Sequence, residues 1–140
     1  MILALLIAFA LGFTGGLRTF VPLFAVRLPH RDWTTLVAGL LLLGELIADK
    51  VPNVPARTSL GPLFGRAVVS GYAAWAVTVP LGLAPAIAVL LAVCGSLAGA
   101  FIGYDWRVRR APALRIPDIA AALAEDVVAV GGALWLVLAA

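Results

Sequence analysis

Long apolar runs separated by short polar stretches dominate the pattern along this chain. A helix needs about 20 mainly apolar residues to cross a bilayer. Five stretches approach that length: 2–26, 34–51, 63–82, 86–104 and 118–139. The pattern therefore predicts an all-α integral membrane protein in which residues 1–140 form one transmembrane domain, a compact bundle of about five helices.

The polar residues between these runs predict where the helices end. Pro52 and Pro55 stop the second run, because proline disfavours helix at the residue before it. The segment 80–85, "PLGLAP", reads as a tight turn, and 104–118 is the most polar connection. Asp118 is a plausible N-cap for the last helix.

Composition agrees with a membrane protein. Hydrophobic residues make up 64% of the chain and charged residues 12%, whereas soluble domains have roughly 45–50% and about 25%. The single Cys94 cannot form an internal disulfide. The net charge of +3 is better explained by membrane topology than by nucleic acid, and no cofactor is expected.

The basic residues predict an orientation. Two of them, Arg27 and Arg31, flank one side of a five-span bundle. Seven flank the other side, which also carries the N-terminus: Lys50, Arg57, Arg66, Arg107, Arg109, Arg110 and Arg115. Positive residues collect in the cytoplasm. We therefore expect a multi-pass protein of the bacterial cytoplasmic membrane, with its N-terminus in the cytoplasm and its C-terminus outside.

Acidic residues lie inside two of the apolar runs. Glu45 and Asp49 are one helical turn apart, and Glu125 and Asp126 lie two turns into the last run. Arg66 lies one turn into the third, at a similar expected depth. A charge at the bilayer centre costs about 2.5–3.5 kcal/mol on insertion scales. These groups should therefore meet inside the bundle, as a site for protons or a cation or as a structural salt-bridge cluster.

The first run is interrupted by "GFTGGLRTFVP", residues 12–22. Its glycines indicate either close helix packing or a broken helix whose free backbone groups bind a ligand. Gly95, Gly99 and Gly103 have a spacing that also favours close packing. Counted along a straight helix, Arg18 falls away from the acidic residues and joins them only if the helix bends. The two hairpins formed by the first two and the last two runs also suggest an inverted repeat.

The stretches "GLRTFVPLFAV" (16–26), "GELIADKVPNVPARTSLGPLFGR" (44–66), "GYDWR" (103–107) and "IPDIAAALAEDVVAVGG" (116–132) resemble the small bacterial membrane proteins grouped as domain of unknown function 4126. The resemblance covers nearly the whole chain. It implies a compact helical membrane protein with no stated biochemical role. The family-like polar positions are Arg18, Glu45, Asp49, Lys50, Arg57, Thr58, Glu125 and Asp126.

These features favour a small transporter or ion-coupled permease. Its substrate- or ion-binding residues would be Arg18, Glu45, Asp49, Lys50, Arg57, Thr58, Arg66, Glu125 and Asp126, and no particular metal is indicated. The expected partners are membrane lipids, a small ion or molecule, and a second copy in a homodimer. The alternatives are a structural or lipid-binding protein clasped by the same charges, or a handler of lipid phosphates that uses Arg18. No hydrolase, nucleotide-binding or zinc motif occurs, so an enzyme is not expected.

Overall fold

The computed structural model describes residues 1–49 and 59–140, and all regular elements in these residues are helical. The longer helices are α1 (Ile2–Leu17), α2 (Val21–Arg27), α3 (Trp33–Ala48), α4 (Leu60–Thr78), α5 (Pro85–Asp105) and α7 (Asp118–Ala139). A short helical turn, η1 (Leu28–His30), connects α2 to α3. The segment η2 (Trp106–Arg110) and the short α6 (Ala111–Ala113) follow α5. The all-α prediction is confirmed for the described residues.

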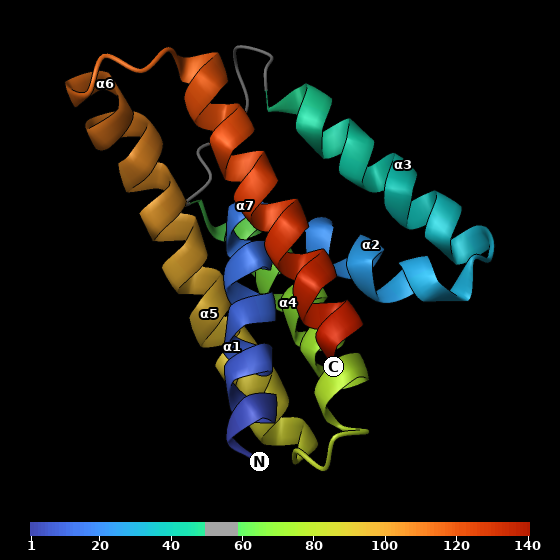
Figure 1. Cartoon of the computed structure of the whole chain (residues 1–140). Coiled ribbons are helices and arrows are strands. Elements are labelled where there is room, and N and C mark those ends of the chain that lie inside the picture. Colours follow the sequence, from blue (N-terminus) through green and yellow to red (C-terminus); the bar gives the residue numbers. More distant parts are fainter. Residues whose placement is uncertain (50–58) are drawn as a thin grey trace.

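The first apolar run forms two helices, which is one of the two interpretations that the sequence left open for it. α1 ends at Leu17, and Arg18 has extended backbone angles (φ −141°, ψ 119°). Pro22 follows in the first turn of α2 and has no N–H to donate to the carbonyl of Arg18, so the helix cannot continue through this point. Figure 1 shows α2 turning sideways from the top of α1 and forming a hairpin with α3.

The expectation of five membrane-spanning helices is wrong. Among the described helices, two are long and apolar enough to cross a membrane: the continuous helical stretch Pro85–Ala113 and helix Asp118–Ala139. Only 39% and 33% of their most apolar segments are buried within the protein. α1 and α3 have 16 residues each, and at 1.5 Å per residue they reach about 24 Å, short of a hydrocarbon core of about 30 Å.

The close packing of α1 on α5 depends on glycines of α1. A Cβ atom on Gly12 would lie 2.2 Å from the carbonyl oxygen of Ala92, and one on Gly16 would lie 2.1 Å from that of Ser96. Neither backbone can yield without moving a whole helix. These two positions therefore require glycine for the approach of the helices.

Glycines of α5 make the same contact from the other side. A Cβ atom on Gly95 would lie 2.1 Å from the carbonyl oxygen of Phe9, and one on Gly99 would lie 2.2 Å from that of Phe13. The predicted packing role of these α5 glycines is thus confirmed, and the helix that they contact is α1 of the same chain. Such small-residue interfaces are typical of helices that pack in membranes.

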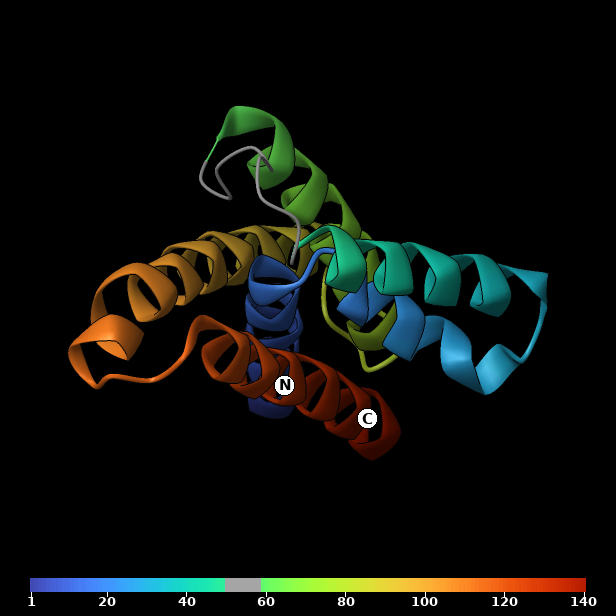
Figure 2. The same ribbon diagram turned by 90° about the horizontal axis from the view of Figure 1, so that it is seen from above.

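The break in the first run also changes the direction of the chain. In Figure 1 the chain ends lie towards one end of the bundle, whereas the end of α3, α6 and the start of α7 lie at the other. Seen from above, the α2–α3 hairpin projects to one side (Figure 2). Because α2 runs sideways, α1 and α3 both rise toward the same end. The N-terminus and the basic segment η2 therefore lie at opposite ends of the bundle. A bundle of five spans would have placed both at the same end.

The two halves of the chain differ in architecture. α1 is broken and followed by a lateral hairpin, whereas α5 is continuous into η2. The inverted repeat expected from the sequence is not evident in this arrangement.

α3 lies on the outside of the bundle. Only Ala38 and Leu42 of this helix are buried, whereas Trp33 and Leu36 are 73% and 71% exposed. Its start is fixed by Asp32, whose Oδ1 accepts a 3.1 Å hydrogen bond from the Thr35 backbone N–H. The hydroxyl of Thr34 also donates to this carboxylate and lowers the pKa of Asp32 below its ordinary value. Large apolar surfaces of this kind mark a protein or membrane contact.

Candidate functional site

The site is centred on Arg18, at the break between α1 and α2. Its side chain is 1% exposed. Nη1 lies 2.8 Å from Asp49 Oδ2, at the end of α3, and Nε lies 2.5 Å from Asp126 Oδ1, in α7. Counted along a straight helix, Arg18 would lie away from the acidic residues. Because α1 ends at this position, its side chain reaches Asp49 and Asp126 instead.

Arg107, at the start of η2, extends this network. Its Nη1 lies 2.6 Å from Asp49 Oδ2, the same oxygen that contacts Arg18. Its Nη2 lies 2.9 Å from Asp118 Oδ2, on the first turn of α7. The sequence suggested only an orienting role for Arg107 and a capping role for Asp118. Asp118 is the first helical residue, the capping position is Pro117, and no side chain caps this helix.

One feature of the sequence could have indicated that Arg107 and Asp118 belong to the site. Both follow or precede an apolar run at the same expected end of the bundle, in the most polar connection of the chain. Their pairing needs the chain of η2 and α6 to turn back on itself, which the sequence pattern does not specify.

Glu45 binds the backbone at the helix break. Oε1 accepts a 2.7 Å hydrogen bond from the N–H of Thr19, and Oε2 accepts a 3.0 Å bond from the N–H of Phe20. These amides precede α2, where the helix leaves N–H groups without partners and favours a negative charge. Glu45 therefore stabilises the start of α2.

Arg66 of α4 binds the other side of the break. Its side chain is 5% exposed, and Nη1 donates a 2.8 Å hydrogen bond to the carbonyl oxygen of Gly16. Nε lies 3.4 Å from the hydroxyl of Thr19. Carbonyls at a helix end lack partners within the helix. Arg66 and Glu45 together satisfy backbone groups that the break exposes.

Glu125 is also buried, with 4% of its surface exposed. It lies beside α5, because a Cβ atom on Gly103 would be 3.1 Å from Glu125 Oε1. Glu125 also lines a pocket of about 380 Å³ between α1, α5 and α7.

The described residues thus bring together six of the nine residues predicted for the site: Arg18, Glu45, Asp49, Arg66, Glu125 and Asp126. Lys50, Arg57 and Thr58 lie outside the described residues. Within the described ranges, no group of three histidine, cysteine or acidic side chains is placed to hold a metal ion.

The arrangement couples several helix ends through one carboxylate. Asp49 Oδ2 contacts both Arg18 and Arg107, which belong to the ends of α1 and α5. Protonation of Asp49, or a cation that competes for it, would weaken both contacts at once. Arg18 would keep its ion pair with Asp126, and Arg107 would keep its ion pair with Asp118, so the element released by such an event would be the end of α3.

Comparisons with protein families, with curated proteins and with solved structures find no match to this chain. The resemblance to the small bacterial membrane proteins of domain of unknown function 4126 stays a prediction.

Proposed function

We propose that this chain is a small permease of the bacterial cytoplasmic membrane, with the Arg18 network as its gate. The observation that carries the proposal is a buried arginine at a helix break, shared between carboxylates of two other helices. Non-helical backbone at membrane depth is tolerated where protein buries it or where it lines a cavity. In transporters, broken helices of this kind form substrate and ion sites.

The membrane location is supported by the surface of the molecule. The helical stretches Pro85–Ala113 and Asp118–Ala139 could cross a bilayer. Large apolar side chains are exposed along the length of the molecule, among them Leu6, Leu40, Leu90 and Trp135. Water would solvate such a surface poorly. The shorter helices would complete the bundle, with α2 and α3 as a hairpin against its side.

The distribution of charge supports an orientation. The end of the bundle with η2 carries Arg107, Arg109 and Arg110, and positive residues favour the cytoplasm. In this orientation both chain termini face away from the cytoplasm. This reverses the N-terminal location expected from five spans, because the break removes one crossing.

The gate would work through the shared carboxylate of Asp49. With Asp49 ionised, Arg18 and Arg107 hold the ends of α1, α3 and α5 together. A proton or a cation at Asp49 weakens this closed state relative to an open one, and a ligand shifts such an equilibrium by its differential affinity for the two states. A homodimer would enlarge the volume available to a substrate.

The test is flux in liposomes that contain the purified full chain. We expect a proton gradient to drive uptake of a permeant substrate, and Asp126→Asn to change the rate by weakening the hold on Arg18. Asp105→Asn is the control, because Asp105 pairs only with the exposed Arg109 and Arg110 among the described residues. A folded wild-type protein that moves neither protons, inorganic ions nor organic cations would contradict the proposal.

A second candidate is a structural or lipid-binding membrane protein. It is favoured by the completeness of the contacts at the break, where Glu45 and Arg66 satisfy backbone groups and Arg18 satisfies two carboxylates. In this case the network is a clasp. Asp126→Asn would then lower the melting temperature without any change in ligand response, and anionic lipid would stabilise the protein with no accompanying flux.

A further inference from the structure

A pocket lies between the tip of the α2–α3 hairpin and the end of α7. Its volume is about 520 Å³, within the range of about 300–1,000 Å³ that is usual for small-molecule sites. Its lining residues are Ala25 of α2, Leu28 and Pro29 of η1, Arg31, and Leu134 and Leu138 of α7. All of them except Arg31 are apolar. The pocket therefore offers hydrocarbon walls and a single cation.

Arg31 follows η1 and places a charge at this pocket. Its backbone lies in the left-handed region (φ 51°, ψ 36°), and its side chain is exposed. Within residues 1–49 and 59–140, its guanidinium group forms no ion pair or hydrogen bond. Asp32 is next in sequence, but its carboxylate accepts from Thr34 and Thr35 at the start of α3 and does not line the pocket. Arg31 can therefore bind an anion from outside the chain.

Arg27, the other arginine near this connection, is directed elsewhere. Its guanidinium group donates to the hydroxyl of Tyr72 in α4 and lies 5.5 Å from the centroid of that ring. A contact of this kind between a cation and an aromatic face is favourable in itself. The charge that remains for a ligand of the pocket is thus the charge of Arg31.

The surroundings of Arg31 are typical of a membrane surface. Trp33, two residues later, is 73% exposed, and tryptophan is enriched where a membrane meets water. Leu138 is also largely exposed. An arginine that faced only hydrocarbon would be costly, whereas one at the level of the lipid headgroups can bind their phosphates through its planar fork of N–H groups. The pocket therefore complements a molecule with an anionic head and a hydrocarbon chain.

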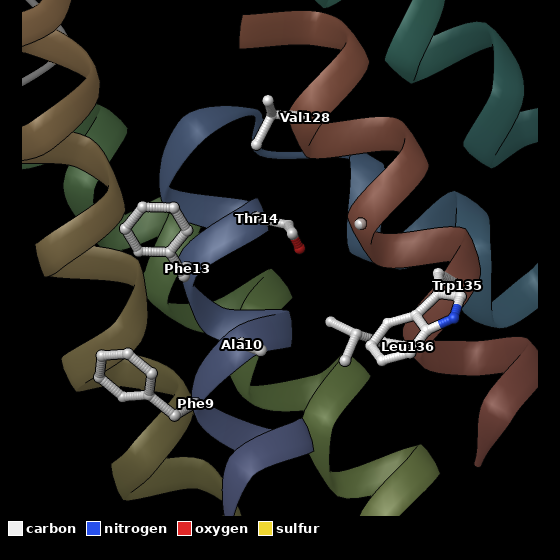
Figure 3. Close-up of a pocket in the computed structure, with 8 residues that line it drawn as sticks. Phe9, Ala10, Phe13, Thr14, Val128, Trp135 and Leu136 are labelled. Carbon is white, nitrogen blue, oxygen red and sulfur yellow. The ribbon is translucent and has the colours of Figure 1, made fainter.

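A second pocket on α7, of about 310 Å³, shows what Arg31 adds. It lies between α1 and α7, with Phe13 on one side and Trp135 on the other (Figure 3). None of its described lining residues is charged, and the hydroxyl of Thr14 donates to the carbonyl oxygen of Leu11 in its own helix. This second pocket can accept hydrocarbon, but it has no group that selects an anionic head.

We propose that the pocket at Arg31 binds an anionic phospholipid, with its phosphate at the guanidinium group and part of an acyl chain along Leu134 and Leu138. A zwitterionic phospholipid gains less from Arg31, because its own ammonium group neutralises the phosphate. Inorganic phosphate has the charge but no chain, so it gains nothing from the apolar walls. These ligands separate the contribution of the charge from that of the apolar contact.

This inference rests on the proposed membrane location but not on transport. A protein that binds the phospholipid and moves no ion or solute would contradict the permease and leave the site intact. A protein recovered from cells without their membranes would contradict the membrane location. A membrane protein that shows no preference between anionic and zwitterionic lipid would contradict the site alone.

The experiment compares phosphatidylglycerol with phosphatidylcholine of the same acyl chains. Each lipid is titrated against the full chain in a nonionic detergent, and bound lipid is measured by native mass spectrometry. We expect phosphatidylglycerol to bind about tenfold more tightly, which corresponds to about 1.4 kcal/mol. Inorganic phosphate at the same concentration should not displace it. Equal affinity for the two lipids, or displacement by inorganic phosphate, would overturn the proposal.

A charge variant assigns the preference to Arg31. Arg31→Gln should remove the preference for phosphatidylglycerol. Arg115→Gln is the matched control, because Arg115 is also exposed and also has a left-handed backbone (φ 57°) but does not line this pocket. It should keep the preference. Equal losses in the two variants would show a general attraction to basic residues and would overturn the site.

A steric variant tests the apolar part of the pocket. Leu138 is 74% exposed, so Leu138→Trp fills the pocket without disturbing buried packing and should weaken the binding of phosphatidylglycerol several-fold. Val127→Trp is the control, because Val127 is 71% exposed on the same helix and does not line this pocket. Binding that is unchanged by Leu138→Trp would contradict the placement of the acyl chain.

Discussion

Arg18 Nη1 lies 2.8 Å from Asp49 Oδ2, and this contact joins the broken end of α1 to the end of α3. The two residues belong to helices that rise toward the same end of the bundle, with the lateral α2 between them (Figure 1). The ion pair therefore connects the end of α1 to the end of α3, the two helices that α2 separates along the chain. The same arginine reaches Asp126 of α7, so one side chain fixes three elements.

Replacement of Arg18 should be strongly destabilising. Arg18→Gln leaves Asp49 and Asp126 without one of their cations inside the protein, and breaking a buried pair in this way costs about 3–5 kcal/mol. Arg18→Lys should fall between Gln and wild type, because an ammonium group lacks the planar fork that reaches two carboxylates. The measurement is unfolding of the purified protein by heat and by denaturing detergent.

The control for Arg18 is Arg109→Gln. Arg109 is 76% exposed and lies 3.5 Å from Asp105 in an exposed pair, and such pairs contribute about 0–1 kcal/mol. Similar losses for Arg18→Gln and Arg109→Gln would show that the buried network does not hold the fold.

Gly16→Ala should separate α1 from α5. The added Cβ atom would lie 2.1 Å from the Ser96 carbonyl oxygen and 2.8 Å from the Ala100 nitrogen, and overpacking of this kind costs about 1–3 kcal/mol. Gly131→Ala is the matched control, because no atom lies within 4 Å of its Cβ position. It should stabilise α7 by about 1 kcal/mol through helix propensity. Melting temperatures that shift in the same direction for both variants would refute this account of the interface.

Glu45→Gln should loosen the start of α2. In the carboxylate, Oε1 accepts from Thr19 and Oε2 accepts from Phe20. Glutamine replaces one of these oxygens by an NH2 group, which donates and faces a backbone N–H, and it also removes the negative charge. Hydrogen bonds to a charged group contribute about 1.5–3 kcal/mol, so these amides should exchange roughly 10- to 100-fold faster. Hydrogen exchange read by mass spectrometry tests this, with peptides of α5 as the internal reference. Unchanged exchange at 19–20 would mean that Glu45 does not hold the break.

Both chain termini should be accessible from the same side of the membrane. The check uses single cysteines in a Cys94→Ser background and a maleimide that cannot cross membranes. Ile2→Cys and Ala140→Cys should label in intact cells, and Leu114→Cys, beside the basic segment, should label only after permeabilisation. Joint labelling of Ile2→Cys and Leu114→Cys would restore the five-span topology.

The sequence predicted where helices form because that information is local. Apolar runs and prolines placed α3, α4, α5 and α7 close to their observed ranges. For the glycine-rich stretch before Pro22 the sequence left two interpretations open, close packing or a broken helix, and the structure shows both: the glycines pack against α5 and the helix ends at Leu17. The cost of charge in an apolar surrounding predicted that Glu125 and Asp126 would lie within the protein interior rather than on its surface, and their side chains are buried or largely so.

The tertiary structure decided what the break does. The direction in which the chain leaves α1 depends on contacts with residues far along the sequence. Glu45 binds the amides before α2, and Arg66 binds the carbonyl of Gly16. Sequence spacing describes positions along one straight helix, so it cannot predict hydrogen bonds between residues of different helices. For this reason the sequence alone identified the charged residues, whereas only the fold determined that Arg18 joins Asp49, that Arg107 shares the same oxygen, and that the N-terminus lies opposite the basic end.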